Sequence, residues 1–171
     1  MNKAIFFDRD GVLNKLIYRD GGFYSPQKFS QFKIEKEAMK VTKTTKSLGF
    51  LNLVVSNQPD ISRQKMNEVD LGKMTNLLKK ELTIDDVFYC KHDDIDNCKC
   101  RKPSSGLIIE ASKKWNIDLK NSFLIGDNWK DIEAGKDVNL KSFLLDKDYN
   151  KCFEFKDRLK SLSDLIDLIR E

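Results

Sequence analysis

Short apolar runs that end in polar residues alternate along this sequence with stretches of helical periodicity. The apolar runs occupy residues 3–7, 50–57, 87–90, 122–127 and 142–145. Helices are expected at about 35–48, 64–82, 103–115 and 129–137, with a last helix beginning at Ser161. Strands that alternate with helices in this way build a parallel sheet. The sequence therefore predicts an α/β fold, a Rossmann-like parallel sheet with helices on both faces.

Size and composition favour one compact domain that covers residues 1–171. Hydrophobic residues make up 40% of the chain and charged residues 34%, which excludes a disordered or fibrous class. The formal charge of +4 is dispersed, so it suits a phosphorylated small molecule, and no nucleic-acid partner is expected. The first apolar run is too short for a signal peptide or a membrane span. We expect a cytoplasmic monomer with no membrane partner.

Two carboxylates follow the first predicted strand. Asp8 and Asp10 are two residues apart, so their side chains point the same way if the backbone stays extended. One carboxylate can attack phosphorus to form an acyl phosphate, and the other can protonate the leaving oxygen and then activate water. Mg²⁺ is the cation expected between two such anions, and Asp127 is placed to complete its ligands.

Hydroxyl, amide and ammonium groups at other strand ends can bind the phosphoryl oxygens. Ser56, Asn57 and Lys102 fit this role, because phosphoryl transfer depends on positioning and charge balance. Each of these short motifs also occurs in ordinary loops and turns. Their order along the chain, each at a predicted strand end or helix start, favours a shared site beyond the carboxyl ends of the strands.

A compact cluster of sulfur and imidazole ligands lies within eleven residues. Cys90, His92, Cys98 and Cys100 supply three thiolates and one imidazole, a complete tetrahedral set for Zn²⁺ with no position left for water. This pattern predicts a structural zinc in the loop 90–100, which leads directly into Arg101 and Lys102. The alternatives are reduced surface thiols or one disulfide. Cys152 lies outside the cluster and is interpreted as an ordinary small apolar residue.

The motifs together resemble those of the haloacid dehalogenase (HAD) superfamily. The four segments that carry this resemblance are Asp8-Arg-Asp-Gly-Val-Leu-Asn14, Ser56-Asn-Gln58, Arg101-Lys-Pro103 and Gly126-Asp-Asn-Trp-Lys-Asp131. They occur in order over the whole chain. Within the superfamily, the sequence is most similar to the zinc-containing branch of heptose bisphosphate and histidinol-phosphate phosphatases. The resemblance implies the HAD core, and the spacing leaves no room for a cap domain.

The resemblance also implies a role for each motif residue. Asp8 would be the nucleophile and Asp10 the general acid and base, while Mg²⁺ would bind the Asp8 carboxylate, the Asp10 carbonyl and Asp127. Ser56 and Lys102 would bind the phosphoryl group. Arg101 would recognise the substrate. Asn57 and Asn128 would contribute hydrogen bonds at the mouth of the site, and Asp131 would support the metal. A solvated helix position explains Asp131 equally well.

The substrate suggested by this resemblance is a phosphorylated sugar. Asn14 and the Gly-Phe-Tyr segment that follows look like heptose bisphosphate phosphatases, which implies removal of the 7-phosphate from D-glycero-D-manno-heptose 1,7-bisphosphate for surface polysaccharide precursors. The five residues between His92 and Cys98 look more like the histidinol-phosphate enzymes, so histidinol phosphate is the alternative. A zinc-stabilised binding protein without turnover is the alternative from a different class. Residues 14–34, with Arg19 to Gly22, are expected to contact substrate.

Overall fold

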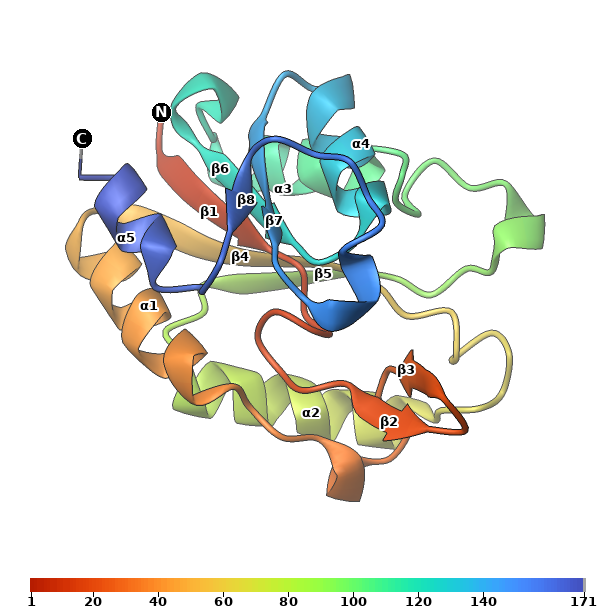
Figure 1. Ribbon diagram of the computed structural model, residues 1–171. Coiled ribbons are helices and arrows are strands. Elements are labelled where there is room, and N and C mark those ends of the chain that lie inside the picture. Colours follow the sequence, from red (N-terminus) through yellow and green to blue (C-terminus); the bar gives the residue numbers. More distant parts are fainter. Residues whose placement is uncertain (171) are drawn as a thin grey trace.

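The computed structural model describes residues 1–170, which form a parallel β-sheet between two layers of helices (Figure 1). Six strands make the sheet in the order β5-β4-β1-β6-β7-β8, and every neighbouring pair is parallel. Their bounds are β1 Lys3–Phe7, β4 Phe50–Asn57, β5 Asp86–Cys90, β6 Phe123–Gly126, β7 Lys141–Leu145 and β8 Arg158–Leu159. The five main helices are α1 Lys36–Ser47, α2 Glu68–Glu81, α3 Gly106–Trp115, α4 Trp129–Asp137 and α5 Asp164–Leu168. The predicted fold class is confirmed.

Alternate residues of the central strand pack on opposite faces of the sheet. Ile5 and Phe7 join one apolar cluster with α1, α2 and α5, whereas Ala4 and Phe6 join a second cluster with α3 and α4. Figure 1 shows the same division of the helices. All four side chains are fully buried, which explains why β1 is a continuous apolar run rather than an alternating one.

The chain reverses direction across the sheet at β1. It passes from β1 to β4 and β5 on one side, and then returns to β6 on the other side of β1. Loops that follow strands on either side of such a switch point diverge and leave a crevice at the carboxyl ends. The segments after β1, β4 and β6 all reach that edge, so the sheet brings Asp8, Ser56 and Asp127 together.

Helix boundaries match the predicted periodicity except at the starts of α2, α3 and α5. α2 begins at Glu68, later than expected, because Asn67 caps it by accepting a 2.7 Å hydrogen bond from the backbone N–H of Asp70. α3 begins at Gly106, so the prediction that Pro103 opens this helix is wrong. The backbone turns first, with a 2.9 Å bond from the Ser104 N–H to the Arg101 carbonyl. Gly106 then packs on the Lys99 carbonyl, which a Cβ would approach to 2.2 Å.

The long loop expected at residues 14–34 contains a β-hairpin. β2 (Ile17–Arg19) pairs antiparallel with β3 (Gly22–Tyr24), and Asp20 and Gly21 form the turn with φ of 48° and 76°. Two consecutive positive φ angles are the geometry of an Asp-Gly hairpin turn. The hairpin packs through Phe23 against the segment that follows β7, where the ring centre of Tyr149 lies 4.9 Å from that of Phe23.

The last helix, α5, is short and begins after the predicted Ser161. The Ser161 N–H and hydroxyl both donate to the Asp164 carboxylate at 2.9 Å, but Ser163 occupies the N-cap position, so the prediction that Ser161 begins the helix is wrong. Leu162 and Leu165 are buried in the cluster with α1. Among residues 1–170, no helix combines the length and the apolar character needed to span a membrane.

Candidate active site

A pocket of about 310 Å³ opens at the carboxyl ends of the strands. Its floor comes from the ends of β1, β4 and β6, and its walls come from the hairpin, α4 and the segment after β7. The residues that line it are Asp8, Asp10, Leu16, Phe23, Ser25, Ser56, Asn57, Lys102, Asp127, Asn128, Lys130, Asp131 and Tyr149. Seven of the residues predicted for the site, and also Asp131, therefore lie together in this pocket.

A buried lysine sits between two carboxylates in this pocket. Lys102 Nζ lies 3.0 Å from Asp8 Oδ1, donates to Asp131, and donates to the Val55 carbonyl at 2.9 Å. Burial opposes the charge of Lys102, but the nearby charges of Asp131 and Asp8 raise its pKa above the usual range. Lys102 is therefore a fixed cation beside Asp8.

Asp131 is fully buried, so its interpretation as a solvated helix position is wrong. Its carboxylate accepts from Lys102 and, at 3.1 Å, from the Asn128 N–H at the start of α4. The approach is so close that a Cβ on Gly126 would lie 2.2 Å from the Asp131 Cβ. Asp131 thus orients Lys102 and caps α4 at the same time.

The pocket holds more negative than positive charge. One oxygen from each of Asp8, Asp127 and Asp131 lies within 4.8 Å of the others, and Lys102 is the cation that contacts this group. Burial raises the pKa of Asp8 to about 6, against the attraction of Lys102. Burial, and then the charge of Asp8, raise the pKa of Asp127 well above its usual range. Carboxylates crowded in this way fit a divalent cation with oxygen ligands, such as Mg²⁺.

Asp127 is held from two sides. The Tyr149 hydroxyl donates to its Oδ2, and Gly11 packs against the same oxygen with φ of +82°. A Cβ on Gly11 would lie 2.0 Å from that oxygen, so glycine is required both for the backbone angle and for the space. Sequence reasoning did not identify Tyr149, which follows β7 and carries no recognisable motif.

Asp10 lines the pocket beside Asp8, and its carboxylate contacts a different set of residues. It accepts hydrogen bonds from the side chains of Arg9, Asn14 and Gln58. All three residues belong to the segments quoted above as motifs, but no role was predicted for Arg9 or Gln58. The sequence signal that could have identified Arg9 is its position between the two aspartates, directly after a predicted buried strand.

The predicted amide residues fix the backbone at the edge of the pocket. Asn57 donates to the Lys102 carbonyl at 2.9 Å and accepts from the Lys102 N–H at 3.0 Å. Asn128 accepts from the Lys130 N–H at 3.1 Å and so caps α4. Ser56 is buried, and its hydroxyl lies 3.1 Å from Gln58 Nε2. Asn57 and Asn128 therefore hold in place the two segments that carry Lys102 and Asp131.

Among the residues predicted to bind the phosphate or the substrate, Arg101 does not line the pocket. Its Nε donates to Asp94 at 2.7 Å, on the loop 90–100. Lys130, which does line the pocket, approaches the same carboxylate at 3.9 Å. Arg101 and Lys130 are therefore neighbours at the rim through Asp94, and sequence reasoning missed Lys130.

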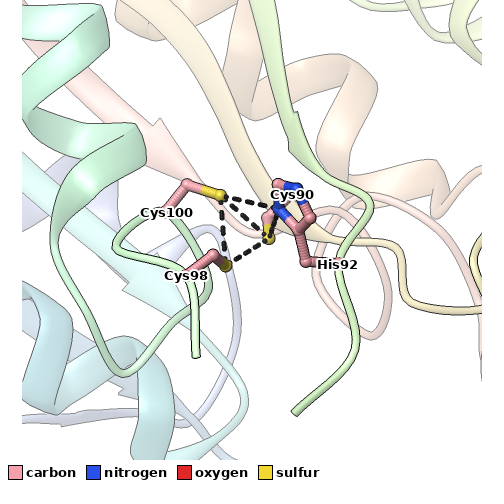
Figure 2. A group of neighbouring side chains, drawn as sticks. All are labelled: Cys90, His92, Cys98 and Cys100. Carbon is pink, nitrogen blue, oxygen red and sulfur yellow. Dashed lines mark hydrogen bonds between the residues drawn. The ribbon is translucent and has the colours of Figure 1, made fainter. Parts of the chain in front are cut away.

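The cysteine cluster forms a closed group next to this rim (Figure 2). The sulfur atoms of Cys90, Cys98 and Cys100 lie 3.1–3.5 Å apart, and His92 Nδ1 lies 3.3 Å from Cys100 and 3.6 Å from Cys90. A tetrahedral zinc with its usual bond lengths needs edges of about 3.8 Å between sulfurs and about 3.5 Å from sulfur to nitrogen. The four ligands are thus close to the size of a zinc tetrahedron.

The burial of Cys90 does not fit the alternative of reduced surface thiols. Cys90 is fully buried, and all four cysteines of the chain are free. Burial raises the pKa of the Cys90 thiol to about 12 when no cation is bound, so binding of a metal ion there would have to displace the thiol proton. Cys152 is exposed and is not part of this group.

The fold is shared with solved phosphatase structures. A D,D-heptose 1,7-bisphosphate phosphatase from B. bronchiseptica, solved with magnesium and phosphate, superposes with a TM-score of 0.82 at 20% identity, covering 98% of both chains. A HAD-like phosphatase from Mesorhizobium loti gives 0.79 at 24% identity, over 98% of this chain and 86% of the other. The chain therefore shares the overall fold of these two structures.

Sequence relatives define the family more narrowly. Residues 99–152 match the HAD-hydrolase-like family. A D-glycero-beta-D-manno-heptose-1,7-bisphosphate 7-phosphatase of Helicobacter pylori is 34% identical over 99% of this chain and 98% of its own, and the alpha-anomer enzyme of Campylobacter jejuni is 29% identical over 99% and 96%. The chain belongs to this family of HAD-type heptose bisphosphate phosphatases, and the resemblance found in its motifs is confirmed.

Proposed function

We propose that this chain removes the 7-phosphate of D-glycero-D-manno-heptose 1,7-bisphosphate through an aspartyl-phosphate on Asp8. The observation that carries the proposal is the position of Asp8 in the pocket, 3.0 Å from the buried cation Lys102. Relatives that cover nearly the whole chain bear this activity in their names, for both anomers. The proposal is therefore made for either anomer of the sugar.

Two displacements account for the reaction. A carboxylate oxygen of Asp8 bonds to phosphorus while the bond from phosphorus to the sugar oxygen breaks, and Asp10 gives that oxygen its proton. Asp10 then takes a proton from water, whose oxygen bonds to phosphorus as the bond to Asp8 breaks. Inorganic phosphate leaves, and both carboxyl groups return to their starting state. Lys102 and Ser56 balance the charge on the phosphoryl oxygens throughout.

Mg²⁺ is proposed as the cofactor, bound by the carboxylates of Asp8 and Asp127 and the carbonyl of Asp10. The excess of buried carboxylates around Lys102 supports this choice. When bound, the ion would reduce the electrostatic repulsion between the phosphate and the Asp8 carboxylate. Asp131 is proposed to act beside this set, by orienting Lys102.

Cations at the rim support a substrate with two phosphates. Lys130 lines the pocket, and Arg101 lies beside it through the shared partner Asp94. We propose that these two side chains recognise the sugar end of the substrate, with Asn57 and Asn128 donating hydrogen bonds at the mouth. The hairpin residue Phe23 covers the opposite wall.

Zn²⁺ is proposed as a structural ion of the loop 90–100. The four ligands leave no position for water, and the loop leads into Arg101 and Lys102. The ion would therefore fix the loop that carries Lys102 into the pocket and Arg101 beside its rim. A thiolate site requires reduced cysteines, which supports the expected cytoplasmic location. We propose that residues 1–171 act as one phosphatase domain on this small phosphorylated sugar.

Phosphate release from a panel of substrates tests the proposal. The panel contains both anomers of heptose 1,7-bisphosphate, histidinol phosphate and an aryl phosphate, each with and without added Mg²⁺. We expect the highest kcat/KM for a heptose bisphosphate and no turnover by Asp8→Asn, with zinc content unchanged. Preference for histidinol phosphate would replace the substrate, and turnover by Asp8→Asn would remove the nucleophile assignment.

A further inference from the structure

The Asp10 carboxylate is held on both oxygens by side chains from two segments. Arg9 Nη2 lies 3.0 Å from each oxygen, Gln58 Nε2 lies 2.8 Å from Oδ2, and Asn14 Nδ2 lies 2.9 Å from Oδ1. Arg9 and Gln58 also contact each other, since Arg9 Nη2 donates to Gln58 Oε1 at 2.8 Å. The carboxylate has no free rotation left within this ring of donors.

Arg9 reaches Asp10 through the protein interior. Its side chain is fully buried, and its guanidinium carbon lies 5.5 Å from the ring centre of Phe32 and 5.6 Å from that of Tyr89. A buried charge is costly to desolvate, and its ion pair seldom adds net stability. Arg9 Nη1 also meets no hydrogen-bond acceptor within residues 1–170. Stability alone therefore gives no reason for this arrangement.

We propose that Arg9 and Gln58 are positioning residues for Asp10. Neither residue lines the pocket, so Arg9 acts on the reaction through the Asp10 carboxylate, and Gln58 acts through that carboxylate and through its contact with Ser56. A fixed carboxyl can transfer its proton along one direction, to the leaving oxygen that approaches Asp8. Gln58 further links Asp10 to the phosphate-binding hydroxyl of Ser56, at 3.1 Å. This inference rests on the proposed function.

A double-mutant cycle separates positioning from support of the fold. Gln58→Met and Arg9→Met are each combined with Asp10→Asn, and kcat/KM is measured with heptose bisphosphate and with an aryl phosphate. In the wild-type background we expect each change to lower kcat/KM for the sugar phosphate by about 10- to 100-fold. The loss with the aryl phosphate should be smaller, because its leaving oxygen needs less protonation. In the Asp10→Asn background, Arg9→Met should reduce the rate further by no more than about twofold, and Gln58→Met should lose less than in the wild-type background, because only its contact with Ser56 remains.

Gln27→Met is the matched control, since Gln27 donates to Asp60 at 2.8 Å away from the pocket. It should leave both rates unchanged. Equal losses with the two substrates, or full losses in the Asp10→Asn background, would overturn the positioning role. If Arg9→Met does not fold, Gln58→Met alone decides the question. A wild-type protein without activity on any sugar phosphate would remove the proposed function, and this inference with it.

Discussion

Replacing the proposed nucleophile Asp8 with asparagine should stabilise the protein when Mg²⁺ is absent. The Asp8 side chain is only 14% exposed, and burial raises its pKa from the ordinary 3.8 to about 6 even with Lys102 at 3.0 Å. A carboxyl whose pKa is higher in the folded state binds its proton more tightly there. Folding stability therefore falls as the pH rises from about 4 through 6.

The size of this effect follows from the pKa change. Each pKa unit corresponds to 1.36 kcal/mol, so ionised Asp8 costs about 3 kcal/mol above pH 7. The asparagine side chain has nearly the same shape and carries no such cost. The free energy of unfolding of Asp8→Asn should exceed that of the wild type by up to about 3 kcal/mol at pH 7.5, and the difference should vanish near pH 4.

Urea unfolding followed by the fluorescence of Trp115 and Trp129 measures this difference. The buffer should lack Mg²⁺ but contain no strong chelator, so that zinc content stays equal in both proteins. Asp148→Asn is the control, because its side chain is 85% exposed and its loss should change stability by less than about 0.5 kcal/mol. Added Mg²⁺ should stabilise the wild type and not Asp8→Asn. A variant no more stable than the wild type at pH 7.5 would refute the reasoning.

Three further substitutions test the metal sites and the core. Gly11→Ala should abolish turnover, because a Cβ on Gly11 would collide with Asp127. Gly21→Ala is the control: Gly21 also has a positive φ, but its Cβ would meet no atom, so turnover should remain. Initial rates distinguish the two variants. Cys98→Ser should lose zinc and lower the folded fraction, measured by metal analysis and circular dichroism; normal folding without zinc would exclude a structural role. Met74→Ala, in a fully buried position, should destabilise by about 2–5 kcal/mol in urea, whereas Val69→Ala, 66% exposed, should change little.

The strand ends could be predicted because two simple rules determine them. An apolar run that stops at a charged residue marks the end of a buried strand, as at Phe7 and Asp8. Parallel strands bring their carboxyl ends to one edge, so Asp8, Ser56 and Asp127 had to meet. The grouping of the cysteines with His92 was equally predictable, because all four residues lie close together in one loop.

Features that depend on three-dimensional packing were not predictable in this way. The start of α3 depends on contact between Gly106 and the Lys99 carbonyl, which no local pattern encodes. Asp131 lies in the first turn of α4, where periodicity alone allows a solvated position, yet its carboxylate is buried against Lys102. Arg101 bonds to Asp94 rather than entering the pocket, because the loop 90–100 folds back toward it.

The two buried cations divide the carboxylates of the site into separate groups. Lys102 contacts Asp8 and Asp131, while Arg9 contacts Asp10. Asp8 and Asp10 are only two residues apart, and a single shared cation would give them similar environments. Separate partners give the two carboxyl groups different electrostatic surroundings: Asp8 shares Lys102 with Asp131, whereas Asp10 has Arg9 to itself.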